Sequence, residues 1–123
     1  MIGATWRSKA TQALLGPDRS PLVPSTLWVG YLDSTGALIA MSGTTAAASG
    51  FEPLGDGVTN SGGLDCGASG TGWHIAAVGL FDAAAGDLVV SAALVDEAGT
   101  PTTVSPTAGD PISFAAGALV FHA

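Results

Sequence analysis

The sequence has few charged residues, very few cations and a single cysteine. Charged side chains make up 11% of the 123 residues, whereas an ordinary soluble domain carries about 25%. The only three cations, Arg7, Lys9 and Arg19, lie within the first 19 residues, and the net charge is −7. So few cations cannot neutralise several phosphates, which argues against direct nucleic-acid binding. The lone Cys66 excludes an internal disulfide, and with it the small disulfide-stapled secreted scaffolds.

Long apolar runs are also missing, although hydrophobic residues make up 47% of the chain and the mean hydropathy is +0.47. No stretch approaches the roughly 18 apolar residues of a membrane-spanning helix, so we expect no membrane span. The apolar run that follows the first two cations is too short for a signal peptide. Leu, Val, Ile and aromatic residues are plentiful and alternate in clear runs, which argues against disorder. We expect one domain over residues 1–123.

Residues 5–15, TWRSKATQALL, form the only segment that clearly predicts a helix. Thr5 can cap its beginning, a Gly-Pro pair ends it, and Trp6 and Leu14 fall on one face. A helix of this length is marginal alone in water. We therefore expect Trp6 and Leu14 to anchor a helical arm, residues 1–16, either to its own subunit or to a neighbour.

The rest of the chain reads as short strands separated by turns. Residues 26–32 and 37–41 predict a hairpin around the turn at 33–36, which has the sequence DSTG. Further strands are predicted at 73–81, 87–95, 100–104, 111–114 and 118–123. This spacing indicates a mainly β fold, namely an antiparallel β-sandwich, jelly-roll-like, or a small barrel, with a short N-terminal helix.

Residues 42–72 are rich in glycine and lack sustained periodicity. We predict a long glycine-rich loop region there, of the kind that is usually functional, mobile or ordered by a partner. Short pairing at 50–54 or 58–64, as an irregular edge strand, stays open. Asp56, Asn60 and Asp65 could supply oxygen ligands to calcium. Asp and Asn are also ordinary loop residues, however, and we predict no metal and no cofactor.

Residues that usually carry catalysis are sparse. His74 and His122 are the only histidines, and each lies within an apolar strand, where an outward-facing or core histidine is more common than a base. Asp65 precedes Cys66, and an acidic neighbour raises a thiol pKa and so disfavours a nucleophile. Two glutamates cannot be assigned as a glycosidase acid/base pair, and no Gly-Lys-Ser/Thr phosphate loop is present. We predict that the chain is not an enzyme, an envelope-degrading activity being the weakest alternative.

Four stretches, taken in order, resemble a family of small virion proteins of tailed phages. They are TWRSKATQALLG (5–16), PSTLWVGYLDSTG (24–36), AAVGLFDAAAGDLVVSAAL (76–94) and PTAGDPISFAAGALVF (106–121). The family, labelled head-decoration or tail-fibre-like, has an N-terminal helix, a Leu-Tyr/Trp-Val-Gly-Leu strand, a Val-Gly-Leu-Phe-Asp-Ala strand and a terminal Phe-Ala-Ala-Gly-Ala-Leu segment. Residues 42–72 depart from it, because they lack a Gly-Gly-Tyr-Ala-Arg-like strand. The resemblance implies a β-sandwich, oligomerisation and a structural role on the virion, with no catalytic residues.

The expected function is that of a capsid decoration (minor capsid) protein on the virion head, which binds the major capsid protein as a homotrimer and reinforces the lattice. A weakly charged surface suits packing against protein, although a monomer with a neutral surface is an alternative. An unpaired cysteine suits assembly in the reducing host cytoplasm. The expected contact residues are Trp6, Leu14, Trp28 and Phe51, with core positions for Leu14 and Trp28 as the alternative. The alternative function is a tail fibre-like or minor tail protein that binds a host-surface glycan.

Overall fold

The computed structural model describes residues 2–15, 26–55 and 57–122, without the side chains at 10–15 and 48. The chain is mainly β, as the strand pattern predicts, with one helix near its beginning. In chain order the elements are α1 (Ala4–Leu15), β1 (Thr26–Leu32), β2 (Leu38–Ala47), a 3-10 turn η1 (Ala48–Gly50), β3 (Phe51–Leu54), β4 (Gly57–Asn60), β5 (Leu64–Ala68), β6 (Ala77–Phe81), β7 (Leu88–Ala93), β8 (Pro111–Phe114) and β9 (Val120–Phe121).

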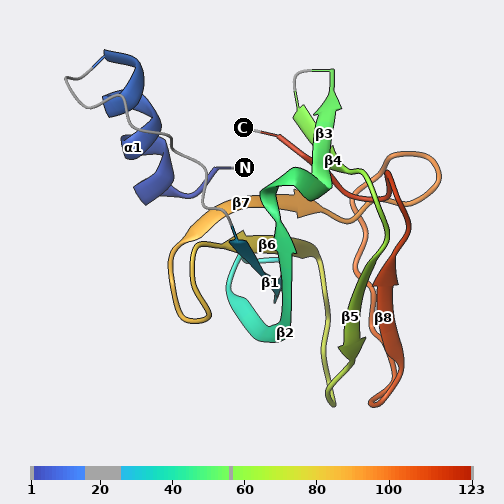
Figure 1. The fold of residues 1–123 in the computed structure, drawn as a ribbon. Helices are drawn as coiled ribbons and strands as arrows, with labels where there is room; N and C mark the ends of the chain where they lie inside the picture. The colour runs from blue at the N-terminus through green and yellow to red at the C-terminus, as the bar shows by residue number, and fades with distance from the viewer. Residues whose placement is uncertain (1, 16–25, 56, 123) are drawn as a thin grey trace.

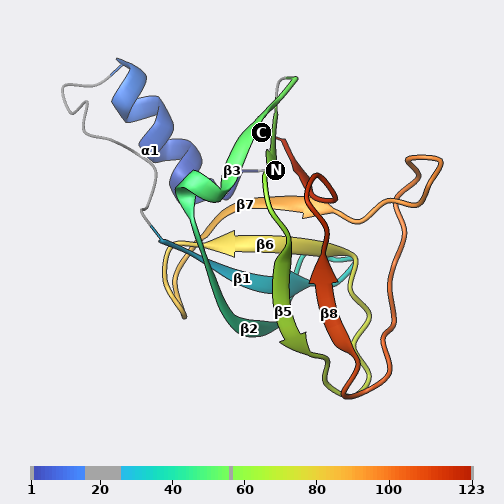
Figure 2. The same cartoon turned by 45° about the vertical axis from the view of Figure 1, so that its right-hand side comes forward.

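The strands form a small antiparallel β-sandwich. One layer is a four-stranded sheet in the order β2-β1-β6-β7, and the opposite layer consists of two smaller sheets, β3-β4-β9 and β5-β8 (Figure 1). In Figure 2, β5 and β8 lie across the strands of the four-stranded sheet. β2 contacts β5, and β7 contacts β9. The described strands thus make separate sheets rather than one closed barrel, which decides between the two predicted architectures.

The core lies between the two layers. Alternate residues of β1 and β6 face it, because side chains on a strand alternate between the two faces. The opposite layer contributes side chains from β5, β8 and β9. The hydroxyl of Tyr31 crosses the core and donates to the carbonyl of Cys66 at 3.2 Å, so the buried phenol has a partner. The buried cluster consists of Leu27, Val29, Tyr31, Cys66, Ile75, Val78, Leu80, Ala92, Ile112, Leu119 and Phe121.

Aspartates close the turns of the sandwich in a repeated arrangement. One carboxylate oxygen of Asp33, and likewise of Asp96, accepts the backbone N–H groups two and four residues further along. Each turn then reaches a glycine at positive φ, Gly36 at 84° and Gly99 at 81°, which is the conformation such a hairpin turn requires. Other carboxylates that accept a nearby backbone N–H belong to Asp65, Asp82 and Asp110. Much of the acidic charge therefore serves turn formation.

The predicted loop at 42–72 is wrong. This stretch contains the second half of β2 and all of β3, β4 and β5. β4 pairs with β9 and β5 with β8, so their partners lie far along the chain and no local alternation announces them. Glycine marks irregularities within strands here, since Gly43, at φ 78°, lies where the register between β1 and β2 shifts. The pairing left open at 50–54 corresponds to β3, and the one at 58–64 overlaps β4.

Two predicted strands are shorter than their hydrophobic patterns. The one at 100–104 is reduced to isolated bridges, in which Pro101 pairs with Val95 and Val104 with Ile75. The one at 118–123 contributes only β9, Val120–Phe121. Proline removes a ladder N–H, which explains why the first of these segments does not form a continuous strand.

Candidate interaction surfaces

The beginning of the chain is seated on the edge of β7. Ile2 forms an antiparallel bridge with Val90, and the N–H of Gly3 donates to the carbonyl of Val89 at 2.9 Å. Gly3 is buried, and a Cβ added to it would collide with the carbonyl oxygen of Leu88. Only glycine fits at this position, because the two backbones approach too closely for a side chain.

Trp6 fastens the same segment to the turn that follows β6. Its indole N–H donates to Asp82 Oδ2 at 3.0 Å, and the ammonium of Lys9 lies 4.3 Å from the centroid of its ring. Trp6 is half-buried. Within the single chain, Trp6 thus contacts its own subunit, which is one of the two expected alternatives. Leu14, the other expected anchor, falls within α1, but its side chain lies outside the described residues.

The remaining two expected contact residues, Trp28 and Phe51, are both half-buried and belong to different layers. Trp28 pairs with Phe81 on the outer face of the four-stranded sheet. Phe51 packs against the core, with its ring edge-to-face on Phe121 at 5.8 Å between centroids and 83° between planes. Phe51 therefore contributes to the packing of its own chain.

The outer face of the four-stranded sheet carries an apolar cluster built over two glycines. Gly30 of β1 pairs with Gly79 of β6, and a Cβ on either would lie 2.9 Å from the ring of Phe81. The ring of Phe81 thus fills the space above both glycines and is only 7% exposed. The sulfur of Met41 also lies 2.9 Å from the Cβ position of Gly30. An aromatic ring over strand glycines protects backbone that would otherwise be exposed.

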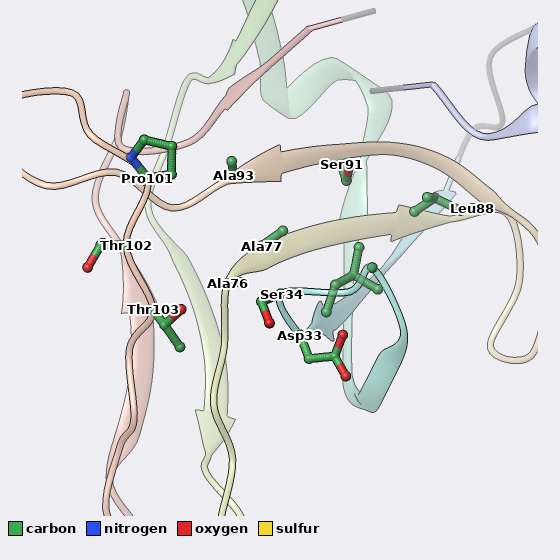
Figure 3. Close-up of a pocket in the computed structure, with 12 residues that line it drawn as sticks. Asp33, Ser34, Ala76, Ala77, Leu88, Ser91, Ala93, Pro101, Thr102 and Thr103 are labelled. Atoms are coloured by element: carbon green, nitrogen blue, oxygen red, sulfur yellow. The ribbon is translucent and has the colours of Figure 1, made fainter.

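Beside this cluster a groove of about 350 Å³ opens on the same face (Figure 3). We call it the sheet groove. Small and hydroxyl-bearing side chains dominate its wall, and the Asp33 carboxylate at its edge already accepts the N–H groups of its own turn. The groove is lined by Leu32, Asp33, Ser34, Gly36, Ala76, Ala77, Leu88, Ser91, Ala93, Pro101, Thr102 and Thr103.

A second hollow, of about 280 Å³, is lined by apolar residues and one serine. We call it the aliphatic cleft. Its lining consists of Ile75, Leu94, Val104, Pro106, Pro111, Ile112, Ser113 and Phe114. Val104 at the cleft is 47% exposed, and Val95, which follows the cleft residue Leu94 in the sequence, is 53% exposed. Exposed aliphatic side chains beside an apolar hollow are typical of an interaction site.

The potential nucleophile and bases do not converge. Cys66 is buried, and burial raises the pKa of its thiol, with the charge of Asp65 adding to the effect. Burial likewise raises the pKa of Tyr31, whose hydroxyl is held in the core. His74 is exposed, and its Nδ1 lies 2.7 Å from Ser105 Oγ. The thiol is therefore kept protonated and away from solvent, which is the opposite of an activated cysteine.

Asn60, one of the three weak calcium candidates, is a structural amide. It is fully buried, and its Nδ2 donates to the carbonyls of Gly62 and Ala115, both at 2.8 Å. Its Oδ1 accepts the N–H of Leu119 at 3.1 Å, so the amide joins β4 to the segment before β9. Asn60, which the sequence offered as a weak calcium candidate or an ordinary loop residue, is instead a buried residue of β4 whose oxygen already accepts a hydrogen bond. The sequence gives no sign of this structural role, because two of the hydrogen-bond partners of Asn60 lie 55 and 59 residues away.

The other two calcium candidates do not complete a site. Asp65 is exposed and accepts the N–H of Gly67 at 3.3 Å, while Asp56 lies outside the described residues. Among the residues that the structure describes, no three His, Cys, Asp or Glu side chains are grouped closely enough to hold a metal ion.

In the described part of the chain, no helix has both the length and the apolar character needed to cross a membrane. Comparison of the chain with protein-family models, with curated proteins and with solved structures found no match. The arm on β7, the sheet groove and the aliphatic cleft are the surfaces from which a function can be proposed.

Proposed function

We propose that this chain is a structural subunit of a tailed-phage virion, a capsid decoration protein that binds the outer head lattice together with other copies of itself. The ordered motifs at 5–16, 24–36, 76–94 and 106–121 suggest the virion family, and the β-sandwich agrees with the fold that this resemblance implies. The observation that carries the proposal is the aliphatic cleft with its exposed Val104, on a chain of which only 11% is charged.

The physical basis of such binding is the removal of apolar surface from water. Each buried Å² contributes about 25 cal/mol, and a standard interface covers about 800 Å² of each partner. Loss of translational and rotational freedom cancels much of that gain. Modest affinity at each position is sufficient on a lattice, because many equivalent contacts hold the same shell.

The location of the protein is the first test. Gold-labelled antibody raised against the purified chain is applied to intact particles and viewed by electron microscopy. Decoration predicts gold over the whole head surface. Gold confined to the tail would overturn the decoration proposal in favour of a tail protein.

The second test concerns the aliphatic cleft. Purified chain is added to heads that lack it, and the bound fraction is measured after sedimentation. Val104→Asp places a carboxylate at the edge of the cleft and is expected to weaken binding at least tenfold. Thr103→Asp is the matched control, because it adds the same charge one residue away in the sheet groove. Equal binding by both variants and the natural chain would exclude the cleft as the contact.

The arm and the glycan alternative are tested separately. Trp6→Ala should weaken docking on the head while the far-UV spectrum of the sandwich is retained, since Trp6 lies on α1 and outside the strands. Loss of the fold itself would refute that assignment.

A tail protein of the alternative kind would bind host glycans on an array, and chelator would reduce binding that needs calcium. If the chain is a decoration protein, we expect no binding to the glycan array.

A further inference from the structure

We propose that the N-terminal arm is exchanged between copies, so that the segment from Ile2 to Lys9 of one chain seats on β7 of a neighbouring chain. The inference rests on the proposed function, because a shell holds copies of this chain side by side. It names the partner of the arm as a second copy of the same chain. The receiving surface, which we call the arm seat, consists of the edge Leu88–Val90 and Asp82.

The arm seat is specific for the segment that it holds. Gly3 approaches the backbone of Leu88 so closely that no side chain is tolerated, and its N–H donates to Val89. Trp6 adds a side-chain hydrogen bond to Asp82. Strand-edge pairing of this kind gives affinity through the main chain and specificity through the side chains. None of these contacts depends on the arm and the seat belonging to the same chain.

The helix that follows the seated residues extends away from the sandwich. Figure 1 and Figure 2 both show α1 standing off to one side of the sandwich, and β7 is the strand that it contacts. Its 12 residues extend over about 18 Å. A single helix of this length is marginal in water, so a neighbouring copy that covered it would stabilise it.

Charge is divided between the arm and the sandwich. All the cations, Arg7, Lys9 and Arg19, precede β1, whereas residues 26–123 contain aspartates and glutamates but no lysine or arginine. A basic arm is therefore attracted to the acidic sandwich of any copy. Complementary charge of this kind favours encounter and correct orientation between separate molecules.

The exchange is thermodynamically balanced, because each contact within a chain is replaced by the same contact between chains. The outcome is set by the effective concentration of the arm near each seat, which is in the millimolar range for a short connection. Residues 16–25 connect α1 to β1, and ten residues can span at most about 35 Å. Copies held side by side on a shell present a neighbour's arm seat at a concentration comparable to that of the chain's own seat. Seating on a neighbour can therefore compete there with seating on the same chain.

The test uses two variants, Ile2→Cys and Val90→Cys, each of which adds one cysteine to the buried Cys66, and one of them carries a mass tag. The hydrogen bond from Gly3 to Val89 makes the bridged pair a non-hydrogen-bonded one, with Cα atoms about 4.5 Å apart, which suits a disulfide. The variants are mixed at about 1 mM, the order of the effective concentration, and oxidised with diamide. A mixed disulfide between the tagged and the untagged chain requires seating between chains.

We expect the mixed disulfide to form at about 1 mM and to fall at least tenfold at about 1 μM, below the effective concentration of the chain's own arm. The double variant Ile2→Cys/Val90→Cys should close within one chain at the low concentration. Gly3→Ala in the Ile2→Cys chain should abolish the mixed disulfide. Gly62→Ala is the matched control and should not, because its added Cβ meets open space.

Closure of the double variant without any mixed disulfide at about 1 mM would overturn the exchange and leave the arm on its own chain. Failure of the double variant to close would overturn the arm seat itself. Neither result bears on the gold labelling of particles. If the mixed disulfide forms but the gold-labelled antibody does not bind the particles, the proposed virion function alone is refuted. If the antibody labels the particles but no mixed disulfide forms, the exchange alone is refuted.

Discussion

Removal of the Asn60 amide should destabilise the sandwich strongly. Asn60→Ala deletes three hydrogen bonds to backbone groups of Gly62, Ala115 and Leu119. A hydrogen bond contributes about 1 kcal/mol net, and the space left by the side chain adds about 1 kcal/mol more. The expected loss is therefore about 4 kcal/mol, a large part of the 5–15 kcal/mol that stabilises a typical domain.

The measurement is equilibrium unfolding in guanidinium chloride, in which the midpoint should fall while the slope stays constant. By the same estimate the melting temperature should fall by about 15 °C. Ser61→Ala is the matched control on the neighbouring exposed residue and should change stability by less than about 0.5 kcal/mol. A loss below about 1 kcal/mol for Asn60→Ala would refute the structural role. Stabilisation of the natural chain by calcium, absent in the variant, would restore the role of Asn60 as a ligand.

Three further predictions follow from the core, the turns and the outer face. Cys66 should react with Ellman's reagent only after unfolding, and a fast reaction in the native chain would contradict its burial. Hydrogen bonds, first from the Thr35 hydroxyl, lower the pKa of Asp33, so its stabilisation is present above the unfolded value near 4 and is lost as pH falls through the folded value. Asp33→Asn should therefore unfold with a weaker pH dependence below about pH 4 than the natural chain, and an equal dependence would contradict this. Gly79→Ala should cost about 1–3 kcal/mol in urea unfolding, because its Cβ would press on Phe81, whereas Gly50→Ala, with open space at its Cβ, should be tolerated.

The parts of the fold that were predictable depend on residues close together in the chain. The hairpin of β1 and β2 is announced by two apolar runs around an Asp-to-Gly turn, and the structure places the turn at 33–36 as expected. The predicted helix at 5–15 matches α1 to within one residue at its beginning. Thr5, expected to cap the helix, lies inside it, and the carbonyl of Gly3 accepts the hydrogen bond from the N–H of Arg7 that begins α1. A turn residue and the periodicity of apolar residues are local signals, so they can be recognised without knowledge of the fold.

The candidate surfaces were less predictable, because they depend on pairing across the chain. Trp6 was identified as an anchor, but Asp82, which accepts its hydrogen bond, is 76 residues away. Phe51 reads as a contact residue from the sequence, yet packing on Phe121 gives it a place against the core. The aliphatic cleft draws on residues from 75 to 114. The periodicity of a dozen consecutive residues cannot indicate which distant residues will contact them in the fold.

By itself, the sequence determined the fold class and the local elements: a sparsely charged, mainly β chain, a basic helical arm and turns built on aspartate and glycine. Only the tertiary structure decided that residues 42–72 form strands, that Asn60 is a buried clamp and that the arm seats on β7. The physical reason is the range of the interactions. Turns and caps form between near neighbours, whereas sheet pairing, burial and close backbone approach exist only once distant segments have been brought together.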